Sequence, residues 1–351
     1  MLNLSFFKGK KIFITGHTGF KGSWLTYILY LSGAKLVGYS LKPKNSFDNF
    51  YLFKLNQKIK NYFGDVRDEK NLKNAIIKFK PDIIFHLAAQ PLVKDSYKDP
   101  KFTLVTNIMG TMNILEIARE SKNLKSVVIV TSDKCYKNFE KKSGYSELDE
   151  LGGQDPYSAS KAAAENIFYS YQKSYFDTKT DVGLVSVRAG NVIGGGDWSK
   201  DRIIPDFIKS IIKKKMFFIR SPNSTRPWQH VFDLLNGYLI LSKKSYGNNK
   251  YNGSWNFGPD KNHLTVKYLI SELCKIMHVK KKLRIKQDKK VKETGLLSLK
   301  IHKSKGLLKW KPKLTYLKTL KLTAEWYQCF IYDKKNIEQL TRTQIKNFFY
   351  D

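Results

Sequence analysis

Short apolar runs of strand length alternate with helically periodic segments in the first half of the chain. This alternation is typical of a parallel sheet whose strands are connected by helices. The apolar runs predict strands at residues 11–15, 35–39, 81–89, 126–131 and 182–187. Apolar residues at helical spacing predict helices at residues 23–31, about 100–121 and about 157–175. We therefore expect an α/β fold built on a doubly wound parallel sheet of the Rossmann type.

The pattern loosens after Asn191, and the three consecutive glycines at 194–196 mark a boundary. Shorter elements follow, with helices expected at 203–213, 232–242, 266–277 and 316–330, and a strand at 217–219. We expect a nucleotide-binding domain over residues 1–190, to which residues of about 232–260 return. Residues 191–351 are expected to form mainly a smaller, mixed C-terminal domain that binds substrate.

A glycine-rich loop links the first predicted strand to the first helix. It runs from Gly16 to Gly22, with Gly19 midway, and also contains Thr18, Phe20 and Lys21. Such a loop lets the backbone approach a pyrophosphate, which then lies on the N–H groups at the helix start. The acidic residue that usually holds the adenosine ribose is missing at the end of the second strand. This feature alone leaves NAD and NADP open, because Lys42 or Lys44 offers a charge for a 2′-phosphate.

Composition narrows the class of protein. The 351 residues include 63 Lys and Arg against 30 Asp and Glu, a formal net charge of +33. Such a charge is often a sign of nucleic-acid binding, but these lysines are spread along the whole chain, so we expect no nucleic-acid partner. Three widely spaced cysteines, no export signal and no apolar run of membrane length indicate a cytoplasmic protein without a membrane partner. No spacing of His, Cys and Asp predicts a metal site.

A candidate catalytic pair lies at the start of the helix predicted near residue 157. Tyr157 and Lys161 are four residues apart and therefore share one face of that helix. A nearby ammonium group stabilises a phenolate and makes the tyrosine a more effective base. Thr131 and Ser132 end the preceding strand, on the sheet edge where such folds bind ligands, and supply a hydroxyl for a proton path.

Over residues of about 8–330, the chain resembles the extended short-chain dehydrogenase/reductase family, whose nucleotide-sugar members carry this loop, this pair and a similar His86–Gln90 stretch. Asp133 and Lys134 follow Ser132 directly, as an acidic residue and a second ionisable residue do in sugar-nucleotide 4,6-dehydratases. The Asp-Lys pair in this chain resembles the pair found in the branch of these enzymes that acts on CDP-glucose. The runs at 16–24, 88–93, 188–198 and 226–230 also resemble that branch.

The resemblance implies bound NAD and a set of cofactor-binding residues: Gly16, Thr18, Gly19, Phe20, Lys21, Gly22, Asp65, Val66, Leu87, Ala88, Ala89, Gln90, Asn107, Thr131, Tyr157 and Lys161. Asp65 is also a plausible adenine contact from its place after a short strand. Substrate binding is expected from Asn191, Arg202, Pro205, Arg220, Arg226 and His230. Among these, Arg226 is favoured for the diphosphate, because a guanidinium fork matches phosphate oxygens, whereas His230 is as consistent with a packed structural residue.

The resemblance also implies catalytic roles for Ser132, Asp133, Lys134, Tyr157 and Lys161. Tyr157 would remove the proton from the C4 hydroxyl of the sugar, Lys134 the proton from C5, and Asp133 would protonate the departing C6 hydroxyl. Which of the last two is acid and which is base follows from the resemblance alone. The expected substrate is CDP-glucose or a similar nucleoside diphosphate sugar, and the expected assembly is a homodimer. The alternatives are a 4,6-dehydratase or 4-epimerase for another nucleotide sugar, and a non-catalytic NAD(H) sensor.

Overall fold

The computed structural model describes residues 4–177, 181–219, 221–260, 264–279 and 296–350, and the backbone of 283–285. Its centre is a seven-stranded parallel sheet with the strand order β3-β2-β1-β4-β5-β6-β11. The strands are β1 (Lys11–Thr15), β2 (Lys35–Ser40), β3 (Lys60–Phe63), β4 (Ile83–His86), β5 (Ser126–Val130), β6 (Gly183–Ala189) and β11 (Gly253–Phe257). This order reverses between β1 and β4, which is the arrangement of a Rossmann sheet and confirms the predicted fold class.

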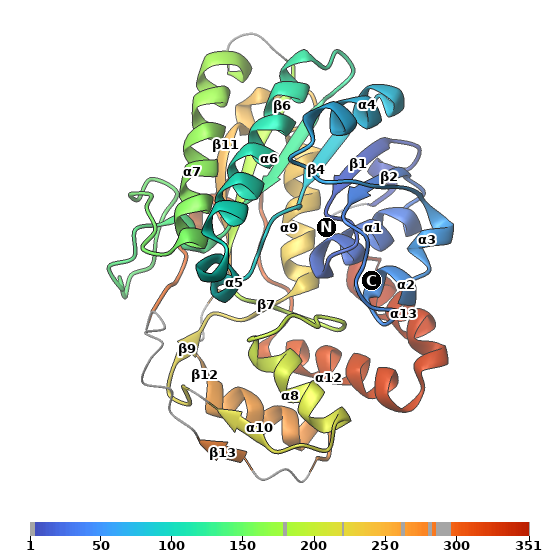
Figure 1. Cartoon of the computed structure of the whole chain (residues 1–351), viewed down its shortest axis with the longest axis vertical. Coiled ribbons are helices and arrows are strands. Elements are labelled where there is room, and N and C mark those ends of the chain that lie inside the picture. The colour runs from blue at the N-terminus through green and yellow to red at the C-terminus, as the bar shows by residue number, and fades with distance from the viewer. Residues whose placement is uncertain are drawn as a thin grey trace.

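Helices cover both faces of the sheet (Figure 1) because alternate residues of each strand point to opposite sides. Phe13 of β1 packs with residues of α4 (Glu69–Phe79), α6 (Pro100–Glu120) and α7 (Pro156–Tyr171). Its neighbours Ile12 and Ile14 pack on the other side with α1 (Phe20–Leu31) and α9 (Val231–Lys244). Because the helices pack on the two faces of the sheet, the carboxyl ends of β1, β4 and β5 are the place where a ligand site is expected.

Much of the later part of the chain forms the lower half of Figure 1, but α9 and β11 lie on the sheet. β11 pairs in parallel with β6, and α11 (His302–Leu307) packs against β11. The other elements of this part are β7 (Val192–Ile193), α8 (Ile203–Ile212), β8 (Phe217–Ile219), β9 (Thr225–Arg226), β10 (Gln229–His230), β12 (Leu264–Thr265), α10 (Val266–Ile276), β13 (Leu283–Ile285), α12 (Tyr316–Tyr332) and α13 (Ile337–Phe349). The division into two domains at residue 190 stays a proposal.

Short helical segments complete the described fold. They are η1 (Leu4–Phe7), α2 (Asn49–Leu52), α3 (Leu55–Lys58), α5 (Val93–Lys98), η2 (Asp133–Cys135), η4 (Asn249–Tyr251) and η5 (Lys334–Asn336), with a π-helical turn, η3 (Gln172–Phe176), after α7. Of these, η2 matters most for the site, because it carries the predicted Asp133–Lys134 pair at the end of β5.

Several predicted boundaries were wrong. The strand expected over 81–89 is β4 and ends at His86, because the chain then leaves the sheet to form a loop beside Thr15. The helix expected to run to residue 175 ends at Tyr171 and continues as η3. Helices α4 and α13 were not predicted. α4 buries three residues, Leu72, Ala75 and Ile76, at helical spacing, and most of its other residues are polar.

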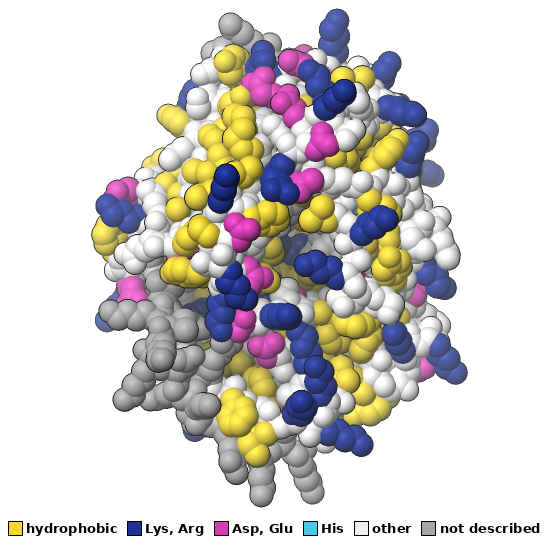
Figure 2. All heavy atoms as spheres, viewed as in Figure 1, with side chains coloured by type: hydrophobic (Ala, Val, Ile, Leu, Met, Phe, Trp, Pro, Cys, Tyr) yellow, Lys and Arg dark blue, Asp and Glu magenta, His cyan; other side chains and the backbone are white. Residues whose placement is uncertain are grey.

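Figure 2 shows basic side chains scattered over one face of the molecule, with acidic ones among them. Hydrophobic side chains gather over the upper left of this face, where α6 and α7 lie in Figure 1. In the described ranges, no helix is both long enough and apolar enough to cross a membrane.

Candidate active site

The glycine loop closes tightly at the carboxyl end of β1. Gly16 has a φ of +72°, and a Cβ there would lie 2.7 Å from the backbone nitrogen of Ala88. A Cβ on Gly22 would lie 2.0 Å from the carbonyl oxygen of Gly16. Helix α1 begins at Phe20 with Gly19 as its N-cap, and no side chain caps this first turn. The loop therefore brings uncapped backbone N–H groups to the sheet edge, which is the arrangement that binds a pyrophosphate.

The ends of β2 and β3 border this loop. The hydroxyl of Thr18 lies 2.8 Å from that of Ser40 at the end of β2. Asp65 lies just after β3, but its two carboxylate oxygens accept hydrogen bonds from Arg67 at 3.0 and 2.7 Å. The carboxylate predicted to contact adenine is thus already paired. Val66 is buried, and its carbonyl accepts a hydrogen bond from Asn113 of α6.

The loop after β4 joins β1 to the two long helices. The backbone N–H of Ala88 donates to the hydroxyl of Thr15 at 3.2 Å. The N–H of Gln90 donates to the side-chain oxygen of Asn107 at 2.8 Å, and the Asn107 amide donates to Ser160 of α7 at 2.8 Å. Leu87 and Ala89 complete this half-buried loop. The predicted cofactor residues of the loop after β4 and of α6 therefore lie together and contact Ser160, the residue before Lys161.

Ser132 connects the predicted catalytic residues. Its hydroxyl donates to Asp133 at 3.0 Å, accepts from the backbone N–H of Lys134 at 3.2 Å, and is hydrogen-bonded to the Tyr157 phenol. The ammonium of Lys161 donates to the carbonyl of Val130 at 3.3 Å, at the end of β5. The fold thus brings η2 and the first turns of α7 to one end of β5.

Burial sets the protonation of these groups. It lowers the pKa of Lys161 to about 8, against the attraction of the Glu165 carboxylate. It raises the pKa of Tyr157 to about 12, although the hydrogen bond with Ser132 acts in the opposite direction. It also raises the pKa of Asp133, against the charges of Lys134 and Arg226. Asp133 is therefore displaced towards its protonated form, as a proton donor requires.

Lys21 brings the glycine loop into this cluster. Burial lowers its pKa to about 8, and the cations of Arg202 and Lys161 lower it further, whereas Asp133 and Asp197 raise it. Its ammonium therefore interacts electrostatically both with the catalytic residues and with the segment before α8. The prediction from the loop motif alone, a pyrophosphate contact, did not anticipate this position.

The predicted substrate residues come from several elements. Arg226 of β9 donates to the carbonyl of Thr225 at 2.8 Å, and its charge acts on Asp133. Arg202 forms an ion pair with the buried Asp197 at 3.1 Å. Two other predicted residues are Asn191, which is exposed, and Pro205, which is buried in the first turn of α8, while Arg220 lies outside the described residues.

His230, a predicted substrate residue, caps helix α9. Its imidazole is buried, and Nδ1 accepts a hydrogen bond from the backbone N–H of Phe232 at 3.2 Å, which caps helix α9. Burial lowers the pKa of His230 to about 3, so the ring is neutral. Cys135 is fully buried, as expected of a structural thiol.

The sequence did not single out Glu165 and Arg188, which form a buried ion pair of 2.7 Å beneath the site. The only local signal was that Glu165 lies four residues after Lys161, on the same helix face. Within the described ranges, no three His, Cys, Asp or Glu residues are grouped to hold a metal ion.

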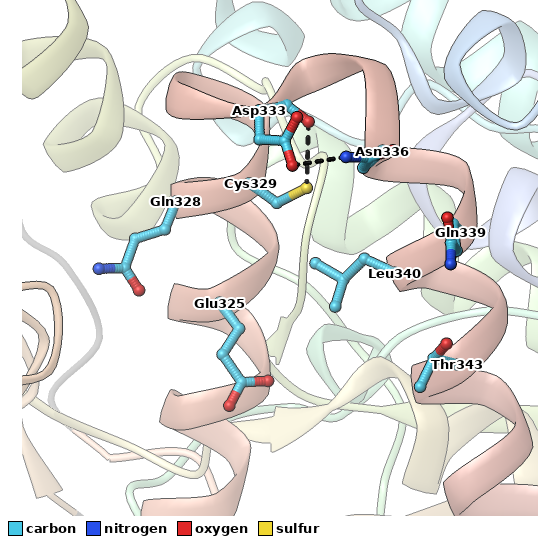
Figure 3. A pocket seen from close by; sticks show the side chains of 8 residues that line it. All are labelled: Glu325, Gln328, Cys329, Asp333, Asn336, Gln339, Leu340 and Thr343. Carbon is cyan, nitrogen blue, oxygen red and sulfur yellow. Dashed lines mark hydrogen bonds between the residues drawn. The ribbon is translucent and has the colours of Figure 1, made fainter.

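A groove of about 510 Å³ lies elsewhere, between α12 and α13. Figure 3 shows Cys329 and Asn336 both directed at Asp333 at one end of this groove. Its lining includes none of the predicted site residues.

Comparison with known proteins agrees with this geometry. Residues 13–323 match the family model described as GDP-mannose 4,6 dehydratase. The chain belongs to this family. Within this dehydratase family, it is 41% identical over 337 residues to CDP-glucose 4,6-dehydratase of Salmonella typhimurium, covering 94% of each chain. It is 26% identical to dTDP-D-glucose 4,6-dehydratase of Homo sapiens, covering 94% of this chain and 93% of the relative.

Solved structures share the fold of this family member. A UDP-glucose 4-epimerase from Thermotoga maritima superposes with a TM-score of 0.80 at 23% identity, covering 91% of this chain and 98% of that one. A dTDP-glucose 4,6-dehydratase from Bacillus anthracis, solved in complex with NAD, has a TM-score of 0.77 at 22% identity, covering 95% and 100%. The predicted membership of the extended dehydrogenase/reductase family is confirmed.

Proposed function

We propose that the chain catalyses the conversion of CDP-D-glucose to CDP-4-keto-6-deoxy-D-glucose, the reaction of a 4,6-dehydratase and hence of a lyase. The observation that carries this proposal is the 41% identity to a CDP-glucose 4,6-dehydratase over nearly the whole of both chains. The Asp133–Lys134 pair beside Ser132 and Tyr157 supports it, because loss of water requires an acid and a base in addition to the group that oxidises C4.

The cofactor we assign is NAD, and the residues present fit it. The glycine loop has no room for side chains at Gly16 and Gly22 and leaves the start of α1 uncapped, as a pyrophosphate site requires. Thr18 lies beside Ser40 at the end of β2, where the adenosine half would lie. NAD held by these residues would supply the hydride acceptor for oxidation at C4 and the hydride donor for reduction at C6.

The chain's own residues move the protons. Tyr157, hydrogen-bonded to Ser132 and one helical turn before Lys161 on α7, takes the proton of the C4 hydroxyl as its phenolate, the form that a lysine cation stabilises. The resulting ketone acidifies the C5 proton, which Lys134 removes. Asp133, whose pKa burial raises, delivers a proton to the departing C6 hydroxyl. When hydride is added at C6, Lys134 returns a proton to C5, which completes the 4-keto-6-deoxy sugar. Arg226, whose charge reaches Asp133, is our choice for the diphosphate.

We further propose that two copies associate through α6 and α7, in the cytoplasm. These helices pack against one another, and exposed hydrophobic side chains lie on them and beside them: Met109 of α6, Tyr169 of α7 and Tyr97 of the adjoining α5. Cys135, Cys274 and Cys329 form no disulfide with one another, as is usual in a reducing compartment.

The dimer proposal predicts that Tyr169→Glu, which adds a charge to the exposed face of α7, converts the protein to a monomer. Light scattering on the purified variant would measure its mass, and Tyr332→Glu, at an equally exposed tyrosine at the end of α12, is the control. A monomeric wild-type protein would overturn the proposal.

An assay with CDP-glucose, UDP-glucose, dTDP-glucose and GDP-mannose tests the function. Formation of a 4-keto-6-deoxy sugar from CDP-glucose alone, with no net release of reduced cofactor, is the expected result. Turnover of a different nucleotide sugar alone would support the 4,6-dehydratase reaction but show that CDP-glucose is not the substrate. The absence of turnover with all four would refute the dehydratase and favour a 4-epimerase or a non-catalytic sensor.

A further inference from the structure

A fully buried ion pair lies under the proposed catalytic residues. Arg188, near the end of β6, donates to a carboxylate oxygen of Glu165 at 2.7 Å. The two side chains are only 4% and 0% exposed. Glu165 is on α7, one turn beyond Lys161. The pair therefore connects the helix that carries Tyr157 and Lys161 to the central sheet.

The Glu165 carboxylate accepts hydrogen bonds from hydroxyl groups of two strands, β6 and β11, and of the residue that follows β5. One oxygen accepts from Thr131 at 2.5 Å, and the other accepts from Ser186 of β6 and Ser254 of β11, each at 2.9 Å. Thr131 is the residue directly before Ser132. Helix α7 is thus tied to the chain segment that begins η2.

Arg188 holds the other end of η2. Its second terminal nitrogen donates to the Tyr136 hydroxyl at 2.8 Å and to the carbonyl of Glu147 at 3.2 Å. The guanidinium also lies over the Tyr136 ring, 4.9 Å from its centre. Tyr136 directly follows η2, and its hydroxyl donates to Asn256 of β11 at 2.8 Å. Asp133 and Lys134 are therefore held from both sides by one network.

We propose that Glu165 and Arg188 are positioning residues, which fix Asp133 and Lys134 relative to Tyr157 and Lys161 and place a negative charge opposite the Lys161 ammonium. The inference rests on the proposed function for its assay. Two buried charges cost more desolvation than well-packed apolar side chains would. The hydrogen bonds of this network offset that cost, and they connect α7, which carries Tyr157 and Lys161, to the residues on either side of η2, which carries Asp133 and Lys134.

The charges around Lys161 identify Glu165 as its anion. On α7 itself, Tyr157 is neutral, because burial raises its pKa to about 12. Cys135 of η2 stays a thiol, because burial raises its pKa, and His86 of β4 is neutral, because burial lowers its pKa to about 3. Lys21 of α1 repels Lys161. Glu165 provides the attraction that opposes the effect of burial on the Lys161 pKa.

The test is Glu165→Gln, assayed with CDP-glucose across pH. The amide keeps the shape but removes the charge, so Lys161 loses its proton at lower pH and Tyr157 loses the cation that activates it. We expect the alkaline limb of the kcat profile to move down by about one pH unit. We also expect kcat to fall about tenfold to a hundredfold while KM changes little, because positioning acts on the chemical step.

A second variant separates positioning from folding. Glu165→Gln combined with Arg188→Met removes both charges and leaves no unpaired cation, so its melting temperature should exceed that of Glu165→Gln alone. Its alkaline limb should stay shifted, because the anion opposite Lys161 is still absent. Asp233→Asn is the control. Asp233 is another buried carboxylate and accepts hydrogen bonds from the backbone of Lys313 and Leu314, so this variant should leave the pH profile of kcat unchanged.

If either Glu165 variant has the same kcat as the wild-type protein and an unshifted alkaline limb of its pH profile, the inference is wrong. If the wild-type protein acts on no nucleotide sugar, the proposed function fails, and the inference is decided without turnover. In that case, the pH dependence of trace acetylation at Lys161, read by peptide mass spectrometry, should shift down by about one unit in the double variant. An equal pH dependence in wild type and variant would refute it.

Discussion

At the residue scale, the feature that separates this site from a simple hydride-transfer site is the pair Asp133 and Lys134. Tyr157, Ser132 and Lys161 suffice to remove a hydroxyl proton, but eliminating water across C5 and C6 needs a second base and an acid. Ser132 contacts both residues of the pair, through its hydroxyl. The hydroxyl that we propose to assist Tyr157 therefore also contacts both of the first two residues of η2.

The first prediction concerns Lys134. In Lys134→Ala, keto-sugar formation should fall about a hundredfold to ten-thousandfold, because the C5 proton loses its base. Oxidation at C4 should survive, so single-turnover absorbance should still show reduced cofactor in the site. Lys137→Ala removes a lysine that is paired with Glu150 at the surface and is the matched control. Unchanged turnover in Lys134→Ala would remove this residue from the mechanism.

At the element scale, strands were easier to predict than the contacts beneath the site. β1 and β5 are buried along nearly their whole length, so each is a continuous apolar run that the sequence shows directly. The glycine loop and Tyr157–Lys161 are local motifs, and their elements meet at one sheet edge as expected. Glu165 on α7 and Arg188 on β6 are 23 positions apart in the sequence, so no local pattern reveals that they form a pair. The place of Lys21 depends likewise on the distant segment Asp197–Arg202.

The second prediction concerns the glycine run between the two halves of the chain. A Cβ on Gly195 would lie 2.0 Å from the Trp326 ring of α12, and the Gly195 carbonyl accepts hydrogen bonds from Trp24 and Asn49. Gly195→Ala should therefore lower the free energy of unfolding by about 1–3 kcal/mol. Gly306→Ala, in α11 with nothing within 4 Å of its Cβ, should be neutral or slightly stabilising. Urea denaturation would measure both, and equal stabilities would contradict the packing described.

At the scale of the whole molecule, three buried histidines link folding to pH. Burial lowers the pKa of His17 to about 4 and those of His86 and His230 to about 3, whereas in the unfolded chain all three titrate near 6.5. Each therefore adds stability that is fully present above pH 6.5 and is lost as the pH falls. Asp233 acts in the opposite direction. Burial raises its pKa to about 6, so its contribution is largest below its unfolded pKa and is lost as the pH rises through 6.

These four groups predict acid sensitivity. Between about pH 6 and 4.5 the unfolded chain binds three more protons at the histidines and one fewer at Asp233. The net of two protons lowers the free energy of unfolding by about 3 kcal/mol for each pH unit. Urea denaturation over this range would measure the slope. His230→Asn keeps an N-cap but removes one titrating group, so its slope should be smaller. A free energy of unfolding that is constant from pH 6.5 to 5 would contradict the buried, neutral state of these rings.

The central claim is that one chain oxidises C4, removes water and reduces C6 within a single site. The most direct measurement is turnover of CDP-glucose carrying deuterium at C4, with mass spectrometry and NMR of the product. We predict that the deuterium appears at C6 of the same molecule, with a solvent-derived proton at C5 and no net consumption of NAD. Deuterium lost to solvent, or retained at C4, would contradict the proposed mechanism.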